Sequence, residues 1–412
     1  MIFLKFLFFE KTKLFYFIIL CSIVISCNNN NDSIPEGKLI NVIFDDNNSL
    51  RFSEYFGEFE IIPLETKQDN LIRKVSDIKI KNDKIFVFSG APDNKINSYD
   101  MQGNYLNSIK NVGGGPGEIN YATSFDLDTC IMVLDRGNKK ILNYNFDCIY
   151  ISEINLRNLY FNKFSIFGTN NIVLFDEMPI KLKTKKQYDT LPKAKLTFWN
   201  IDDNLKIKQI AHAPDLNPGK RIHIILKNSF SIYENNLFYW DVFNDTINKV
   251  DLSTYECNTF QVLNFGDSKI PKSIFNNAFN VDIQPAELIK IIKKGYAFIN
   301  DYTYCQNNMQ FFIIRRNFKD YIGFIKDNEL ELETFLKINF DNLHEKLKIN
   351  VTPQAIYPIY YDKQVSFYLS WEALDFINTF QELRSQITPT EWKLLLNSNH
   401  SLMKALEMVK ID

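Results

Sequence analysis

The chain has 412 residues and a formal net charge of −2 at pH 7, with 47 basic and 49 acidic residues. This balance excludes the concentrated positive charge that a nucleic-acid-binding protein needs. The six cysteines form no CxxC pair and the four histidines are dispersed, which excludes the usual spacing of a zinc motif. Buried free thiols are the simplest interpretation of the cysteines, and a disulfide is the alternative.

The first residues predict an export signal. The lysines of MIFLKFLFFEKTK precede an uncharged run over residues 14–26, which is shorter than the roughly 20 residues that cross a bilayer as a helix. Residues 24–27, VISC, resemble the bacterial lipobox, in which the cysteine becomes N-terminal and is acylated. We predict a lipoprotein signal peptide over residues 1–26, a lipid on Cys27 and a flexible tether over residues 27–38. An ordinary signal peptide or a short anchor is the alternative.

Removal of this leader would take away three lysines and one glutamate, so the net charge would become −4. The mature protein would therefore still lack a basic surface typical of nucleic-acid binding.

The middle of the chain contains a repeat. The stretch FDLDTCIMVLDRGNKKILNYN at 125–145 matches FSIYENNLFYWDVFNDTINKVD at 230–251, with Asp135 and Asp241 in the same place, 106 residues apart. Two units of about 53 residues would account for this offset. A third copy at 77–100 has Ser89 instead of the acidic residue, and a fourth begins at 164–176 and is interrupted by an insertion over 177–193.

Each copy alternates apolar and polar residues between turns rich in Asn, Asp and Gly, which predicts four antiparallel strands. Four strands in about 50 residues is the size of a propeller blade. The expected fold is therefore all-β, a six-bladed β-propeller over residues 39–370. Residues 56–65 are expected to close the ring by pairing with strands within 354–370.

Two helical segments are expected besides the strands. One short helix is predicted around residues 284–292, before the fifth blade. C-terminal helices are predicted over 371–412, packed on the propeller, and Thr388, Pro389 and Glu391 have the spacing of a capping box. A partner-binding amphipathic helix is the alternative interpretation of this tail.

The stretch NVGGGPGEIN at 111–120 concentrates glycine as a phosphate-binding loop does. A P-loop would continue with Lys-Ser or Lys-Thr into a helix, whereas here the strand FDLD follows. Glycine tolerates positive φ and Pro116 fixes its own φ, so we interpret the stretch as a corner between blades. Glu118 is the residue there that could also contact a ligand.

The run GGGPGEINYATSFDLDTCIMVLDRGNKKILNYN resembles the NHL-type repeat. Together with the lipobox and EIIPLET at 60–66, it is similar to the six-bladed β-propeller lipoproteins of Gram-negative gut bacteria. The resemblance spans about residues 39–370 and is weaker after Phe265. It implies an NHL-like propeller that binds a ligand at the cell envelope, with a lipid anchor in the outer membrane.

Two functions follow as hypotheses. The first is a monomeric, lipid-anchored binding module of the cell envelope, without a cofactor, whose ligand is a small molecule, a glycan or a partner protein; Glu118, Arg136 and Trp240 are its candidate contacts. The second is a hydrolase or lyase with Ca²⁺ or Zn²⁺ in the central channel, held by Asp135, Asp176 and Asp241. Each of these aspartates could instead cap a turn. Trp199 and Trp240 could instead be buried between blades, where they would contact no ligand. No catalytic nucleophile is predicted, so the binding function is preferred.

Overall fold

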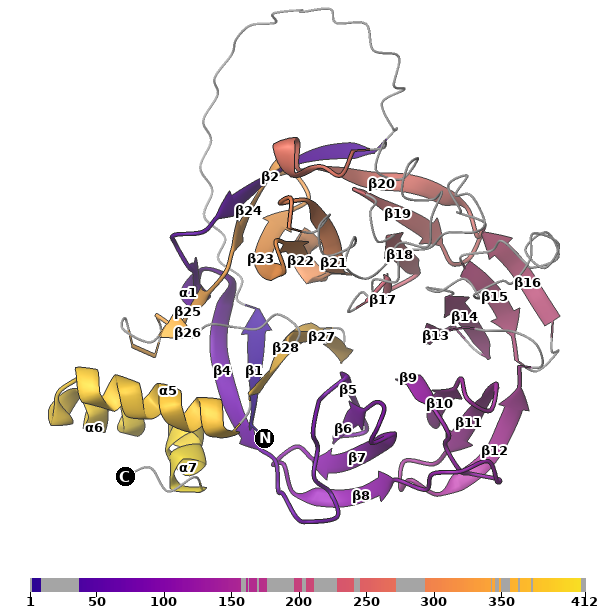
Figure 1. Ribbon diagram of the computed structural model, residues 1–412, viewed down its shortest axis with the longest axis horizontal. Coiled ribbons are helices and arrows are strands. Elements are labelled where there is room, and N and C mark those ends of the chain that lie inside the picture. Colours follow the sequence, from indigo (N-terminus) through magenta and orange to yellow (C-terminus); the bar gives the residue numbers. More distant parts are fainter. Residues whose placement is uncertain are drawn as a thin grey trace, which may run out of the picture.

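The structure is a computed structural model. It describes residues 2–8, 37–156, 161, 163–168, 170–175, 196–201, 205–210, 228–240, 245–271, 293–341, 343–344, 348–349, 356–361, 364–371 and 373–408. Strands dominate these residues, and their sheets stand side by side around a common centre (Figure 1). The fold is therefore all-β and propeller-like, as the alternating pattern predicts.

Three consecutive stretches of chain each form a four-stranded antiparallel sheet in which strands adjacent in sequence are adjacent in space. The first contains β5 (Asp77–Lys81), β6 (Lys84–Ser89), β7 (Lys95–Asp100) and β8 (Tyr105–Ile109). The second contains β9 (Ala122–Leu127), β10 (Ile131–Asp135), β11 (Lys140–Tyr144) and β12 (Tyr150–Asn155). The third contains β13 (Lys163–Phe167), β14 (Asn171–Phe175), β15 (Leu196–Asn200) and β16 (Leu205–Ile210).

The next two units are joined into a sheet of nine strands. One unit contains β17 (Phe230–Tyr233), β18 (Asn236–Trp240), β19 (Thr246–Asp251) and β20 (Cys257–Asn264). The other contains β21 (Ala297–Tyr304), β22 (Met309–Arg316), β23 (Lys319–Lys326) and β24 (Glu331–Phe335). Strand β2 (Lys38–Asp45) lies between β20 and β24 and runs parallel to both, so it connects the two units.

The remaining four-stranded sheet has the order β27 (Ile356–Tyr361), β28 (Gln364–Trp371), β1 (Ile2–Phe8) and β4 (Phe56–Pro63). Residues 56–65 were expected to pair directly with the strands of 354–370, and this detail is wrong. Strand β4 belongs to the same sheet, but β1 lies between β4 and β28 and pairs antiparallel with both. The leader was not expected to contribute a strand, because its composition predicts a signal peptide.

Smaller elements complete the chain. They are β3 (Leu50–Arg51), β25 (Ile338–Asn339) and β26 (Lys348–Ile349) in one short sheet, α1 (Phe52–Tyr55), and the 3₁₀ turns Gly266–Ser268 and Gln306–Asn308. The helix expected around residues 284–292 and the insertion at 177–193 lie outside the described residues.

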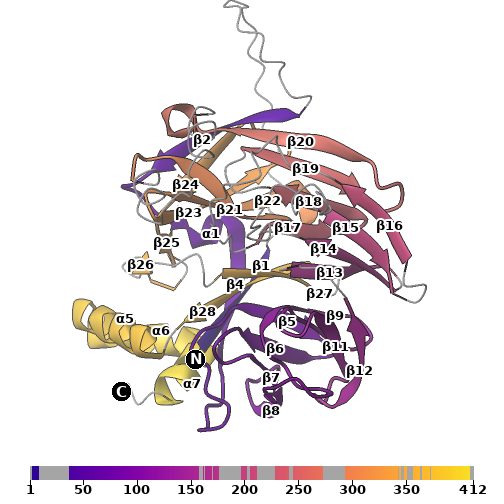
Figure 2. The ribbon, with the colours of Figure 1, turned by 45° about the vertical axis from the view of Figure 1, so that its right-hand side comes forward.

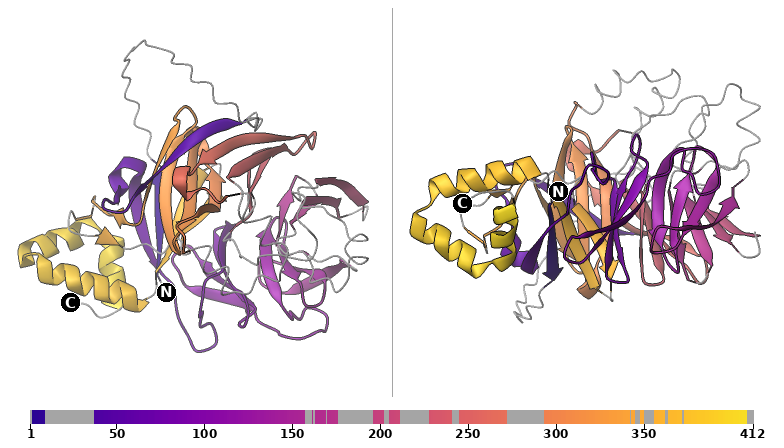
Figure 3. Two further views of the ribbon diagram at one scale, coloured as in Figure 1. Left: turned by 45° about the horizontal axis from the view of Figure 1, so that its top comes forward. Right: turned by 90° about the horizontal axis from the view of Figure 1, so that it is seen from below.

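Three helices follow Trp371, namely α5 (Ala373–Gln386), α6 (Pro389–Ser398) and α7 (His400–Met408). They lie outside the ring of sheets, beside β4, in all the views (Figures 1, 2 and 3). The backbone N–H of Ile61 in β4 donates to Ser401 Oγ of α7 at 3.1 Å. The helices therefore pack against the outer edge of the sheet that contains β4.

The hydrophobic core lies between neighbouring sheets. Phe88 of β6 packs against Phe125 of β9, with ring centroids 5.7 Å apart. Comparable clusters join each later sheet to the next, and another joins the β4 sheet to the β5–β8 sheet. Because each sheet is covered on both faces, its second strand is a continuous apolar run, as in IFVF of β6 and LFYW of β18.

Candidate functional site

Asp135, at the end of β10, is fully buried and holds the following turn together. Its Oδ1 accepts hydrogen bonds from the backbone N–H groups of Tyr121 (2.9 Å), Gly137 (3.0 Å) and Asn138 (3.2 Å). Its Oδ2 accepts from the N–H of Asn120 (2.9 Å) and from Asn138 Nδ2 (2.7 Å). A carboxylate offers about four lone-pair sites, so these five donors saturate it.

This arrangement corrects the metal hypothesis at Asp135, because binding an ion there would break hydrogen bonds to the turn. The capping interpretation is the one the geometry supports. Asp176 and Asp241 lie outside the described residues. Within the described ranges, no three His, Cys, Asp or Glu residues come together as a metal site.

The glycine-rich stretch is a corner between β8 and β9, and β9 begins directly after it. The N–H of Gly115 donates to Glu118 Oε2 at 2.8 Å, and a Cβ on Gly113 would collide with that same oxygen. Gly117 has φ +71°, and a Cβ there would meet Tyr150 Cγ at 2.8 Å. Glu118 therefore braces the corner from inside with one carboxylate oxygen, and because the residue is partly exposed, its contact with a ligand stays a prediction.

Two side chains, the buried Lys140 and the partly buried Asn138, tie this corner to the sheet that follows it. Lys140 Nζ donates to the carbonyl oxygen of Gly115 (3.2 Å) and pairs with Glu153 Oε2 (2.9 Å). Asn138 Nδ2 donates to the carbonyl oxygen of Gly113 (3.0 Å). Residues of the repeat therefore fix the corner, and this explains why corner and repeat occur together in the sequence.

Trp240 was a candidate ligand contact, and the structure contradicts this. Its side chain is fully buried and packs edge-on against Tyr302, between the two units of the nine-stranded sheet, with ring centroids 5.8 Å apart. Trp199 is partly buried beside the cluster between the second and third sheets. Arg136 remains partly accessible, and its backbone N–H donates to the carbonyl oxygen of Tyr121 at 2.9 Å.

Cys27 and its surroundings lie outside the described residues, so lipid attachment stays a prediction. Cys130, Cys148, Cys257 and Cys305 are free thiols. Among the described helices, none combines the length and apolar character needed to cross a membrane.

The first strand of each sheet lies nearest the centre of the ring (Figure 1), and these strands contain a charged cluster that the sequence analysis missed. Asp126 of β9 accepts from Ser165 Oγ (2.6 Å) and from the N–H of Ile166 (2.8 Å), both in β13. Its Oδ1 pairs with Lys79 Nζ of β5 at 3.0 Å. One carboxylate thus connects the first strands of three successive sheets.

The electrostatics of this cluster favour a charged lysine. Desolvation acts to lower the pKa of Lys79, but the attraction of Asp126 and Asp77 outweighs it, and the pKa is raised. The Lys79 side chain is 29% exposed, so solvent reaches part of it.

A second polar group lies on the first strands of the other half of the ring. Asn228 Nδ2, just before β17, donates to both carboxylate oxygens of the buried Asp301 in β21, at 3.1 Å each. Tyr357 of β27 donates to the carbonyl oxygen of Val75 at 3.0 Å. Burial raises the pKa of the Tyr357 hydroxyl, and the nearby charges of Asp77 and Asp301 raise it further.

We call Lys79, Asp126, Ser165, Asn228 and Asp301 the inner-strand polar cluster. They form two groups, Lys79 with Asp126 and Ser165, and Asn228 with Asp301. Both carboxylates are buried, and the partly exposed members are Lys79, Ser165 and Asn228. The signal that would have found them is polar residues within otherwise apolar first strands, as in DIKIK, ATSFDL and AFINDYTY. Such an arrangement suits the recognition of a polar ligand more than covalent catalysis.

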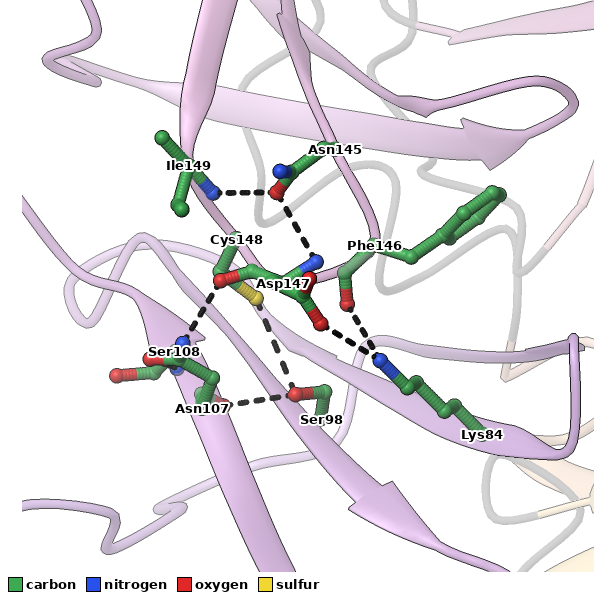
Figure 4. A network of polar contacts seen from close by, with 9 residues as sticks. All are labelled: Lys84, Ser98, Asn107, Ser108, Asn145, Phe146, Asp147, Cys148 and Ile149. Atoms are coloured by element: carbon green, nitrogen blue, oxygen red, sulfur yellow. Dashed lines mark hydrogen bonds and ion pairs between the residues drawn. The ribbon is translucent and has the colours of Figure 1, made fainter.

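A separate polar network joins the outer parts of the first two sheets (Figure 4). Lys84 Nζ of β6 pairs with Asp147 Oδ1 (2.8 Å) and donates to the carbonyl oxygen of Phe146 (3.2 Å), both in the turn between β11 and β12. Asn107 Nδ2 of β8 donates to the carbonyl oxygen of Asp147 (2.7 Å). Beneath it, Cys148 Sγ faces Ser98 Oγ at 3.9 Å. This network fixes neighbouring sheets to each other and lies away from the ring centre.

Comparisons with known proteins now bear on this geometry. The model of a family described as a domain of unknown function, DUF4934, matches residues 37–403. A crystal structure of an inferred exported protein from Bacteroides fragilis NCTC 9343 has a TM-score of 0.59 and 18% identity, covering 82% of this chain and 91% of that one. A DUF4221 family member from Bacteroides vulgatus ATCC 8482 has a TM-score of 0.46 and 12% identity, covering 75% and 94%.

The likeness to the exported protein shows a shared fold. The comparison with curated proteins finds no significant match. Neither the family description nor the description of the exported protein names an enzyme.

Proposed function

Because the chain belongs to the DUF4934 family, whose function is unknown, we propose that it is a lipid-anchored binding module of the cell envelope that recognises a polar ligand at the centre of its ring. The observation that carries the proposal is the inner-strand polar cluster, in which Lys79 and Asp126 form a partly accessible ion pair between sheets. A rigid ring with charged groups at its centre is a suitable scaffold for binding.

The proposal includes a six-bladed propeller. Its six blades would be the four consecutive units from β5 to β20, the unit β21–β24, and the sheet of β27, β28, β1 and β4. The core clusters between successive sheets support this count. The NHL-like corner and repeat support the same architecture. A crystal structure of the protein would check the count directly.

Anchoring rests on the sequence of the leader and on Cys27. We expect that cells supplied with a clickable palmitate analogue label the wild-type protein and that Cys27→Ala abolishes the label and releases the protein from the membrane fraction. Cys21→Ala is the matched control and should keep both properties. Unchanged labelling of the Cys27→Ala protein would refute lipid attachment at this residue.

Ligand recognition is tested with a glycan array and, in parallel, with capture of envelope proteins followed by titration of each candidate. Lys79→Met should weaken binding of an identified ligand at least tenfold, because it removes the positive charge of this partly exposed side chain while keeping a side chain of similar length. Lys319→Met, at an exposed position of β23, is the matched control. Equal binding by both variants would place the site elsewhere.

The metal-dependent enzyme remains the alternative function, although the geometry of Asp135 removes its best-supported ligand. Elemental analysis of the purified protein separates the two functions. Stoichiometric Ca²⁺ or Zn²⁺ that is lost in the Asp135→Ala, Asp241→Ala double variant would favour the enzyme.

A further inference from the structure

Strand β1 completes a sheet that is otherwise built from the two ends of the family domain. Ile2 to Phe6 pair antiparallel with Trp371 to Phe367 of β28, and Ile2 to Phe8 pair antiparallel with Pro63 to Phe56 of β4. The order β27, β28, β1, β4 therefore matches the four-stranded order of the other units, with β1 in the third position.

The same residues are the ones that processing would remove. The family match begins at residue 37, so β1 lies outside the family domain, and the leader predicted for residues 1–26 includes all of β1. Without β1, the facing edges of β28 and β4 would be about 9 to 10 Å apart, which is twice the usual strand spacing. Both edges would then present unpaired N–H and C=O groups.

The other edge of β4 is already covered, since the N–H of Ile61 donates to Ser401 Oγ of α7. Within the part of the chain that the structure describes, every strand already belongs to a sheet, so none of these strands is free to fill the slot. A second copy of the mature chain would have to unpair one of its own strands to donate it.

We propose that the processed protein binds an extended apolar peptide segment of a partner protein as the third strand of this sheet, by strand addition on two edges at once. This inference rests on the leader removal in the proposed function. The chain's own residues 2–8, IFLKFLF, show the kind of segment that the slot accepts. The partner's segment would run antiparallel to β28 and β4. It would contain no proline, because backbone N–H donors are needed on both of its edges.

The test uses mature protein that begins at Cys27 and a synthetic IFLKFLF peptide with added lysines for solubility. We expect the melting temperature to rise with peptide concentration, as it does for any ligand that binds only the native state. Backbone amides of β4 and β28 should become protected from hydrogen exchange. A peptide with Pro in place of its third residue, which corresponds to Leu4, is the matched control and should have neither effect.

Three further outcomes are informative. If the mature protein folds poorly alone, refolding with the peptide but not with the proline peptide should raise the folded yield, which supports the slot. Equal effects of both peptides, or no effect of either on a stable protein, overturn it. N-terminal mass spectrometry of protein from cells tests the leader removal separately, since retention of residues 2–8 would refute processing while leaving the peptide result interpretable.

Discussion

Asp135 is the residue on which the turn after β10 depends. Replacing it with Ala would leave buried N–H donors of the turn without an acceptor, which typically costs 1–3 kcal/mol per unsatisfied group. Because part of the turn can relax toward water, we expect Asp135→Ala to lower the free energy of unfolding by about 3 kcal/mol. Denaturant titration measures this change.

The control for this prediction is Asp267→Ala, since Asp267 is exposed and surface substitutions usually change stability by less than about 0.5 kcal/mol. Addition of a chelator to the wild type should leave its unfolding curve unchanged. A chelator effect as large as that of the substitution would mean that Asp135 binds an ion after all.

Cys148 provides a prediction about pH. Burial raises the pKa of its thiol to about 11, whereas an unfolded cysteine ionises near 8.5. The folded thiol therefore carries less thiolate than the unfolded one at every pH below about 11, and the thiolate is the reactive form.

We expect Cys148 to react with iodoacetamide at pH 8.5 at least tenfold more slowly in the native protein than in urea, with the rate in native protein still rising above pH 9.5. Peptide mass spectrometry measures each site. The charge of Lys84 acts to lower the pKa of the Cys148 thiol, so Lys84→Met should raise that pKa and slow native labelling further. A fast native reaction of Cys148 in the wild type would contradict the raised pKa of this partly buried thiol.

Among the elements, helix α6 has the start that its sequence predicts. Thr388 Oγ1 accepts from the N–H of Glu391 (3.3 Å), and the Glu391 carboxylate accepts from the N–H of Thr388 (2.6 Å), with Pro389 in the first turn. Removing an N-cap hydroxyl typically costs about 1 kcal/mol. We expect Thr388→Ala to lower the free energy of unfolding by about that amount and Thr388→Ser to retain most of it.

Thr390→Ala is the matched control, because Thr390 lies in the first turn without a capping role. A loss confined to the helix, seen as faster hydrogen exchange of α6 with an unchanged global transition, would show that the helices unfold separately from the sheets.

Local signals account for what the sequence could predict among these elements. The capping box, the corner at 111–120 and the strand pairs around Asp135 depend on residues near one another in the chain, so their pattern is visible there. The positions of β1 and β2 depend on backbone pairing with distant strands, β28 for β1 and β20 and β24 for β2, to which their composition gives no guide. The inner-strand polar cluster was missed for a similar reason, since Lys79 and Asp126 look like ordinary surface residues of strands until the sheets are set side by side.

At the scale of the whole molecule, residues 39–64 connect sheets that are distant in sequence. Most of β2 lies in this range and joins β20 to β24, and β4 lies in the sheet that also contains β27 and β28. The pairing partners of β2 thus come from the later half of the chain, whereas β4 pairs with β1 at the start of the chain.

Deletion of residues 39–64 should therefore abolish cooperative unfolding, because it removes strands from three sheets and opens the ring. We expect the shortened protein to melt over a broad temperature range, with a van't Hoff enthalpy well below its calorimetric enthalpy. We expect the full chain to melt in one transition, in which the two enthalpies agree. Deletion of residues 28–36 from the predicted tether is the control and should leave the melt unchanged. If the chain without residues 39–64 still melts in a single sharp transition, the sheets are held by their face-to-face apolar packing alone, and closure of the ring contributes little to stability.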